Sequence, residues 1–318
     1  MDCFRPVECT GLRNDGLDKS IVTVRRPCMP TLGTLAHCPS YLAPMASFAH
    51  GRLTMAVHRY GQGPLHVLAF HGFDRSGADF AVLAPPLATL CTLHAFDLPF
   101  HGESPGFDPV DPVRPSELAA FFNAYAAHIG TARVGLLGYS LGGRIALCML
   151  EQQPALVDRA FLLAPDGLVA RPWYRALAHY RAGRWMYRAF IRHPRAFHGL
   201  IGLLHRLHLL DARMYRFLMD RTATERARAL LHQVWCDFRL IEPALPTVAE
   251  NLRRQAIPLD LMLGRHDRVI RPAMARRLHD LAPGQVHVHF LPTGHRMLNE
   301  AVGALIAAGL AHGPDDAS

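Results

Sequence analysis

One serine flanked by glycines constrains this chain more than any other feature. Ser140 lies in the run Leu-Leu-Gly-Tyr-Ser-Leu-Gly-Gly, with Gly138 and Gly142 two residues away on either side. Residues 133–137 have the apolar character of a short buried strand, and residues 144–151 that of a helix. A sharp strand-to-helix turn needs small residues at the flanking positions, and it raises the serine hydroxyl beside the first amides of the helix. The pattern predicts a nucleophile elbow.

A serine hydroxyl becomes a nucleophile only when a base takes its proton and a third group orients that base. Asp267 follows the apolar stretch 257–263 in a Gly-x-x-Asp turn, and His295 follows the alternating stretch 285–291 in a Gly-His turn. We expect His295 to act as the base. We expect Asp267 to hold its imidazole in the tautomer that accepts the serine proton.

A second part of the site is predicted where the apolar stretch 66–70 runs into a His-Gly loop. The oxyanion that forms during acyl transfer needs two positioned donors, commonly the amide after the nucleophile and one from such a loop. We expect these donors to be the backbone N–H groups of Leu141 and Phe73, with Gly72 permitting the close approach. The alternative is an ordinary strand-to-helix turn with no role in binding.

Another polar loop contains Asp97, His101 and Ser104, directly after the strand-like stretch 91–96. These side chains resemble a site in composition, but they lie next to one another on a single loop. We expect them to form a hydrogen-bonded structural turn.

Together these segments resemble the α/β-hydrolase-fold family. The loop at 71–72, the run at 97–104, the elbow at 138–142 and the later acid and histidine match that family in type, order and approximate spacing, over residues 52–312. The resemblance implies an α/β fold, with a doubly wound, mostly parallel sheet of the eight-strand type.

The resemblance also bears on the acid and on the nucleophile. Asp166, which follows the strand-like stretch 158–163, is the alternative acid because some members of the family resemble that arrangement. Members that resemble epoxide hydrolases and haloalkane dehalogenases attack with an aspartate at the elbow. Ser140 excludes this chain from that group.

The alternation of strands and helices stops between residues 166 and 250, where bulky apolar side chains such as Trp173 and Trp185 are interleaved with arginines. We therefore expect a hydrolase core at 51–165 and 251–312 with a helical insertion at 166–250. In a chain that resembles this family, the insertion implies a cap over the serine whose apolar underside lines the substrate pocket.

The arginines of the insertion, from Arg171 to Arg239, clearly outnumber its acids. Most are expected on the solvated faces of amphipathic helices. The alternative is that some attract a carboxylate, a phosphopantetheine carrier or an anionic membrane surface.

Residues 1–50 contain scattered proline, glycine and cysteine without a sustained period, and a strand-like alternation begins at Arg52. We expect a poorly ordered extension before the folded domain. The alternative is that translation starts at Met45, so that the preceding residues are not made.

The formal net charge of +8 invites a nucleic-acid interpretation, but Lys19 is the only lysine and no nucleic-acid-binding motif is present, so no such partner is expected. The seven cysteines include no Cys-x-x-Cys pair, and their number is odd. The chain also lacks a signal-peptide core and any apolar run long enough to span a bilayer. We expect a cytoplasmic protein without stable membrane insertion.

The predicted function is hydrolysis of carboxylic esters through an acyl-enzyme, with a small-molecule acyl substrate as the partner and no cofactor needed. No metal site is expected, because the pairs His205 with His208 and His287 with His289 lack partner ligands. Thioester or C–C bond cleavage, a cofactor-free perhydrolase or haloperoxidase, and a non-catalytic binding protein remain alternatives. Acyl length and oligomeric state stay open.

Overall fold

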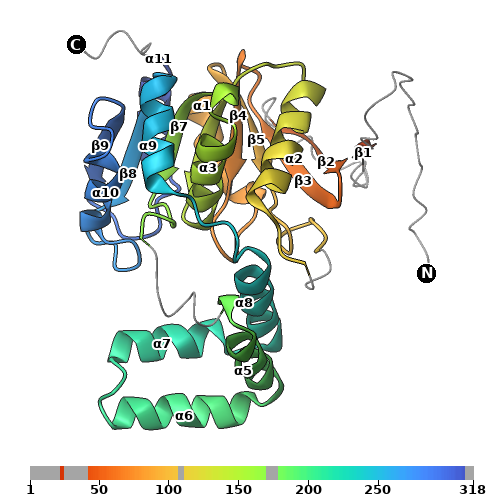
Figure 1. Cartoon of the computed structure of the whole chain (residues 1–318). Coiled ribbons are helices and arrows are strands. Elements are labelled where there is room, and N and C mark those ends of the chain that lie inside the picture. The colour runs from red at the N-terminus through yellow and green to blue at the C-terminus, as the bar shows by residue number, and fades with distance from the viewer. Residues whose placement is uncertain (1–21, 25–41, 107–110, 170–177, 312–318) are drawn as a thin grey trace, which may run out of the picture. The chain divides into compact units, whose positions relative to one another are not determined.

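The computed structural model describes residues 22–24, 42–106, 111–169 and 178–311, and its contacts divide the chain into two compact units (Figure 1). Unit 1 comprises Met1–Phe107, Pro115–Val169 and Glu242–Ser318, and unit 2 comprises Asp108–Arg114 and Ala170–Ile241.

Unit 1 is built on one sheet with the strand order β1-β2-β3-β5-β4-β6-β7-β8-β9. The pairs β1–β2, β2–β3 and β3–β5 are antiparallel, and the other neighbours are parallel. The predicted mostly parallel sheet of the eight-strand type is confirmed in β2 to β9, and β1 adds a short strand at one edge. The strands are β1 (Val22–Val24), β2 (Leu42–His50), β3 (Leu53–Tyr60), β4 (Leu65–Phe70), β5 (Cys91–Phe96), β6 (Val134–Tyr139), β7 (Val157–Leu163), β8 (Leu259–Gly264) and β9 (Val286–Leu291).

Helices cover both faces of this sheet, so its central strands are buried at successive residues rather than at alternate ones. Every residue of β5 and β6 is buried. Figure 1 shows α2, α3 and α9 side by side across one face, and α11 packs against α1 and the turn before it. The helices are α1 (Ala84–Leu87), α2 (Pro115–His128), α3 (Leu141–Gln152), α9 (Leu245–Arg254), α10 (Arg276–His279) and α11 (Glu300–Ala311), with 3₁₀ turns at Gly77–Leu83, Pro154–Leu156 and Pro272–Ala275.

The sheet begins earlier than the predicted domain start at residue 51. Strand β2 pairs with β3 along its length, and Phe48 is buried with its ring 5.4 Å from Phe121 and 5.2 Å from Tyr125 of α2. The alanine-rich stretch 42–50 carries little apolar periodicity, and its strand conformation depends on pairing with β3 and packing against α2. The alternative start at Met45 stays a prediction.

The helical insertion is also shorter than the predicted range 166–250. Helix α9 belongs to unit 1, because its buried residues Val248, Ala249 and Leu252 face the core of that unit. Asn251 of α9 donates hydrogen bonds to the carbonyl oxygens of Leu150 and Glu151 at the end of α3, at 3.1 Å and 3.0 Å. Periodicity alone could not distinguish this core helix from the helices of the insertion.

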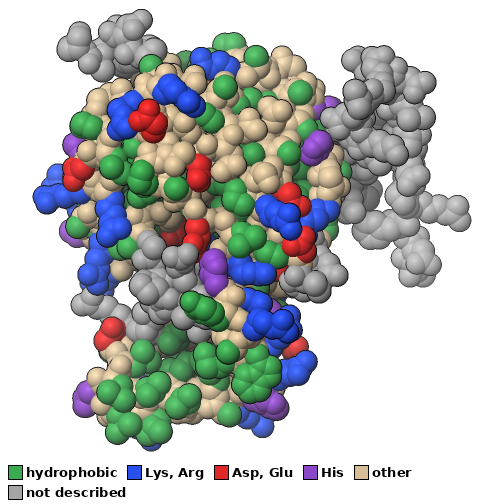
Figure 2. All heavy atoms as spheres, viewed as in Figure 1, with side chains coloured by type: hydrophobic (Ala, Val, Ile, Leu, Met, Phe, Trp, Pro, Cys, Tyr) green, Lys and Arg blue, Asp and Glu red, His purple; other side chains and the backbone are tan. Residues whose placement is uncertain are grey.

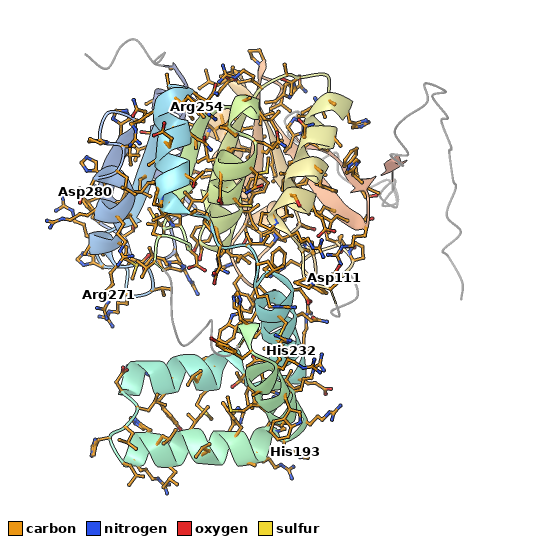
Figure 3. The ribbon with its side chains drawn as sticks, viewed as in Figure 1. Asp111, His193, His232, Arg254, Arg271 and Asp280 are labelled. Atoms are coloured by element: carbon orange, nitrogen blue, oxygen red, sulfur yellow. The ribbon has the colours of Figure 1, made fainter. Side chains whose placement is uncertain are left out.

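The described part of unit 2 contains helices and no strand. Its helices are α5 (Arg181–Arg192), α6 (Pro194–Arg206), α7 (Ala212–Arg221) and α8 (Glu225–Asp237). Tyr187 of α5 stacks on His232 of α8, labelled in Figure 3, with ring centroids 5.3 Å apart. Trp173, Tyr174 and Leu177 lie outside the described residues, and the predicted cover over Ser140 stays a prediction.

None of the helices in the described ranges combines the length and the apolar character needed to cross a bilayer.

Candidate active site

Ser140 lies at the turn between β6 and α3, with φ 51° and ψ −112°. A positive φ is costly for a residue with a Cβ, so the surrounding structure has to hold this conformation. The N–H of Ser140 donates to the carbonyl of Leu163 at 3.0 Å. Its own carbonyl accepts from the N–H groups of Gly143 at 2.9 Å and Asp166 at 2.8 Å. Three backbone hydrogen bonds therefore hold the turn.

The two flanking glycines are required by close backbone approach. A Cβ on Gly138 would lie 2.7 Å from the carbonyl oxygen of Gly142 and from Cα of Gly143. A Cβ on Gly142 would lie 1.8 Å from the carbonyl oxygen of Phe70 at the end of β4. Any side chain at either position would force the helix away from the sheet.

The loop after β4 passes directly against the elbow. A Cβ on Gly72 would lie 3.3 Å from Cβ of Ser140 and 3.2 Å from the ring of Tyr139. Phe73 follows in that loop. Leu141 is the first residue of α3, and the first N–H groups of a helix have no acceptor within it. Leu141 thus follows Ser140 directly, and Phe73 follows the glycine that lies against it; their role as oxyanion-hole donors stays a prediction.

His295 links the serine to a carboxylate across the ends of three strands. Its Nε2 lies 3.1 Å from Oγ of Ser140, and its Nδ1 lies 2.8 Å from Oδ2 of Asp267. A carboxylate accepts only, so Nδ1–H donates to Asp267 and Nε2 accepts from the serine hydroxyl. Asp267 and His295 follow β8 and β9, whose carboxyl ends lie together because the strands are parallel neighbours.

Asp267 is buried, with 5% of its surface exposed, and its second oxygen is also used. Oδ1 accepts hydrogen bonds from the N–H groups of Val269 at 2.7 Å and Ile270 at 2.9 Å. Burial alone would raise the pKa of Asp267, but the hydrogen bonds from His295 and from these amides outweigh it and hold the pKa below its ordinary value. The group is therefore an ionised acceptor at neutral pH.

Asp166, the alternative acid, has a different partner. Its carboxylate forms an ion pair with Arg144 on α3, and Oδ1 accepts the N–H of Gly167 at 2.9 Å. The carboxylate that the structure places on Nδ1 of His295 is that of Asp267.

The polar loop after β5 is a structural turn, as predicted. Buried Asp97 accepts hydrogen bonds from the N–H groups of Gly77 at 2.6 Å and Glu103 at 2.8 Å, and it lies 3.1 Å from Nε2 of His58. Ser104 donates to the backbone carbonyl of Asp97 at 2.5 Å. The polar side chains of Asp97 and Ser104 are therefore occupied by hydrogen bonds that hold the loop in place.

Tyr139 is a functional candidate that sequence reasoning missed. Its hydroxyl donates to the backbone carbonyl of His295 at 2.9 Å, and the two rings lie 5.6 Å apart. The side chain is buried, and burial raises the pKa of its hydroxyl, which stays a donor. Its place inside the elbow was visible in the sequence, but no local pattern indicated a partner 156 residues away.

One histidine of each pair with metal-like spacing has another partner. His205 lies 2.9 Å from the carbonyl oxygen of Leu210, and His289 lies 2.7 Å from Oδ1 of Asp260. Among the residues that the structure describes, no group of three or more His, Cys, Asp and Glu side chains is arranged to hold a metal ion.

The sequence is similar to those of known hydrolases. A family model described as alpha/beta hydrolase fold matches residues 66–301. A pimeloyl-[acyl-carrier protein] methyl ester esterase of Stenotrophomonas maltophilia (strain R551-3) is 31% identical over 252 residues, which cover 76% of this chain and 89% of the relative. The uncharacterized hydrolase YugF of Bacillus subtilis (strain 168) is 24% identical over 258 residues, 76% of this chain and 88% of that protein.

Solved structures share the fold at lower identity. A membrane phospholipase A, described as a bacterial virulence factor, superposes with a TM-score of 0.62 and 23% identity, covering 87% of this chain and 88% of that one. At this identity the likeness concerns the fold alone.

Proposed function

The chain belongs to the α/β-hydrolase-fold family, and from that basis we propose that it is a serine hydrolase that cleaves carboxylic esters through an acyl-enzyme. The observation that carries the proposal is the hydrogen-bonded line from Oγ of Ser140 through His295 to Asp267, at 3.1 Å and 2.8 Å. A base within hydrogen-bond reach of the nucleophile, oriented by a third group, is the arrangement that acyl transfer needs.

The reaction proceeds in two halves. Nε2 of His295 takes the hydroxyl proton while Oγ of Ser140 attacks the ester carbonyl, and the N–H groups of Leu141 and Phe73 stabilise the oxyanion. The C–O bond to the alcohol then breaks, and the imidazolium gives its proton to the departing oxygen. Water, deprotonated by the same histidine, attacks the acyl-enzyme and releases the acid and the free serine. Asp267 stays ionised throughout and stabilises the imidazolium.

The choice of an ester rests on the relatives together with the site. The relative from Stenotrophomonas maltophilia is named for hydrolysis of a methyl ester, and this chain covers 89% of its length. A serine with a neutral histidine base suits an ester because the alcohol leaves once it is protonated. We assign carboxylic esters as the substrate class.

Labelling with a fluorophosphonate, followed by hydrolysis of p-nitrophenyl esters from acetate to palmitate, tests the proposal. Wild type should be labelled and should hydrolyse at least some of the esters. In Ser140→Ala, labelling should disappear and kcat should fall by about a thousandfold or more, with little change in melting temperature, because the nucleophile is lost while the core is intact.

Ser116→Ala provides a matched control, since Ser116 is exposed on α2. It should behave as wild type in both assays. Labelling that persists in Ser140→Ala would contradict the assignment of the nucleophile. A folded wild type that is neither labelled nor active would indicate a non-catalytic binding protein on this fold.

A further inference from the structure

Unit 2 carries a concentration of exposed apolar side chains. The described chain has fourteen large hydrophobic residues that lie exposed, and seven of them fall between residues 180 and 209. Surfaces of soluble proteins rarely gather such side chains without a binding role. Figure 2 shows hydrophobic side chains over much of the visible surface of this unit. The seven are Tyr180, Trp185, Met186, Leu200, Leu203, Leu207 and Leu209.

Exposed leucines form a stripe along α6 and its C-terminal cap. Leu200 and Leu203 of α6 and Leu207, which caps the helix, recur at spacings of three and four, which places them on one side. Ile201 is the buried residue of α6. Trp185 and Leu209 are each 72% exposed, so these side chains contribute little to the packing of unit 2 itself.

The same segment has an unusual charge. From residue 167 to residue 210 the sequence contains no aspartate or glutamate. The described part of this stretch, 178–210, holds six arginines, none of which forms an ion pair with another described residue. Ordinary solvated helices mix both signs of charge. The six are Arg181, Arg184, Arg188, Arg192, Arg195 and Arg206.

We propose that α5 and α6 bind the surface of a bilayer that contains anionic lipids. The arginines would pair with lipid phosphates, and the tryptophan and leucines would enter the boundary between headgroups and acyl chains. Arginines next to exposed Trp and Leu, without acids, have the composition of an interfacial helix pair. The seven apolar residues and six arginines together form what we call the lipid-binding face.

The charge of the lipid-binding face favours an anionic bilayer over a second copy of the chain as the partner that covers it. A symmetric dimer through the lipid-binding face would bring twelve arginines together with no acid from this segment to offset them. Like charges across an interface oppose association. An anionic bilayer instead supplies negative charge for the arginines and an apolar layer for the exposed hydrophobic side chains.

Co-sedimentation of the full chain with vesicles tests the proposal. Phosphatidylcholine vesicles with phosphatidylglycerol should bind at least about tenfold more protein than phosphatidylcholine alone, because each arginine near an anionic surface strengthens binding several-fold. Raising the salt concentration should reduce binding by screening that attraction. Trp185 emission should shift to the blue on anionic vesicles and be quenched by brominated lipid, and Trp185→Phe should abolish this part of the signal.

Two double variants and their matched controls test whether vesicle binding depends on the lipid-binding face or on apolar and basic residues anywhere on the chain. Leu203→Ser/Leu207→Ser and Arg181→Gln/Arg188→Gln should each weaken vesicle binding by about tenfold or more. Leu65→Ser/Leu281→Ser removes two exposed leucines elsewhere, and Arg276→Gln/Arg277→Gln removes the same charge from α10. Both controls should bind as wild type.

Several outcomes would overturn the proposal. One is equal binding with and without phosphatidylglycerol, and another is an equal loss of binding in the control variants. A dimer in light scattering that Leu203→Ser/Leu207→Ser dissociates would assign this face to a second copy. Binding to an acidic carrier protein without binding to vesicles would assign it to a protein partner. Because the readout is binding, these results are independent of whether the chain hydrolyses esters.

Discussion

At the scale of single residues, the position of His295 depends on groups at the ends of two other strands, β6 and β8. Asp267 holds Nδ1 of its ring, Ser140 lies at Nε2, and Tyr139 holds its backbone carbonyl. The first two contacts orient the ring, and the third anchors the loop that carries it. Each contact can be removed by a substitution that changes only one or two atoms.

Asp267→Asn should lower kcat by about a thousandfold or more, because an amide at this position favours the wrong imidazole tautomer and cannot stabilise the cation. Steady-state hydrolysis of a p-nitrophenyl ester measures the effect. Asp166→Asn is the comparison, since Asp166 pairs with Arg144, and it should retain kcat within about tenfold. A larger loss in Asp166→Asn than in Asp267→Asn would identify Asp166 as the acid.

Tyr139→Phe should lower kcat about five- to tenfold without a change in KM, because the His295 loop loses its anchor while the ring packing stays. The matched control is Tyr125→Phe, in which a buried tyrosine loses a hydroxyl 2.8 Å from Nδ1 of His94. Both variants should lose about 1 kcal/mol of stability. An equal fall of kcat in both would show that Tyr139 acts only through stability.

At the scale of elements, α3 approaches the sheet more closely than a helix with side chains could. The carbonyl of Phe70 on β4 occupies the position where a Cβ of Gly142 would lie. This close approach places the N-terminus of α3, and hence the Leu141 amide, beside Ser140. The geometry of the candidate oxyanion hole therefore depends on helix packing as well as on the turn.

Gly142→Ala should abolish activity and destabilise unit 1 by several kcal/mol, because the contact is with backbone that cannot move aside. Gly202→Ala on α6 adds the same methyl group where nothing lies within 4 Å. It should be neutral or stabilising by about 0.5–1 kcal/mol through helix propensity. Denaturant unfolding and ester hydrolysis measured on both variants check this contrast, and a harmless Gly142→Ala would contradict the packing argument.

At the scale of the whole molecule, buried neutral histidines couple the stability of unit 1 to pH. Burial, with smaller contributions from His66 and Arg59, lowers the pKa of His94 to about 3. Burial also lowers the pKa of His71. The unfolded chain binds a proton on each near pH ~6.5. Between that pH and the folded pKa the unfolded state holds more protons, so stability falls as pH falls.

The unfolding free energy should therefore decrease from about pH 6.5 toward pH 3, by up to about 1.4 kcal/mol per pH unit for each such histidine. Denaturant unfolding at a series of pH values measures the slope. His94→Gln should reduce the slope of unfolding free energy against pH by up to about 1.4 kcal/mol per pH unit, the contribution of one proton. His287→Gln, at an exposed position on β9, should leave it unchanged. Identical slopes in wild type and His94→Gln would contradict the argument.

Features that depend on local backbone geometry could be predicted from the sequence. A serine between two glycines at the end of an apolar run predicted the elbow, and the observed contacts of Gly138 and Gly142 explain why glycine is needed there. The central strands β6 and β7 were visible as mostly apolar stretches, because their residues are buried by helices on both faces of the sheet. Turn chemistry and burial leave their pattern in neighbouring residues, so no distant contact has to be known.

Tertiary structure decided everything that depends on which distant segments meet. The pairing of His295 with Asp267 rather than with the alternative acid Asp166 follows from β8 and β9 being neighbours in the sheet, and the bond from Tyr139 joins residues 156 positions apart. The strand at 42–50 and the assignment of α9 to unit 1 likewise depend on packing partners. Composition and periodicity describe how a segment is buried. They do not say against which segment it packs, because that choice is made by the free energy of the whole core.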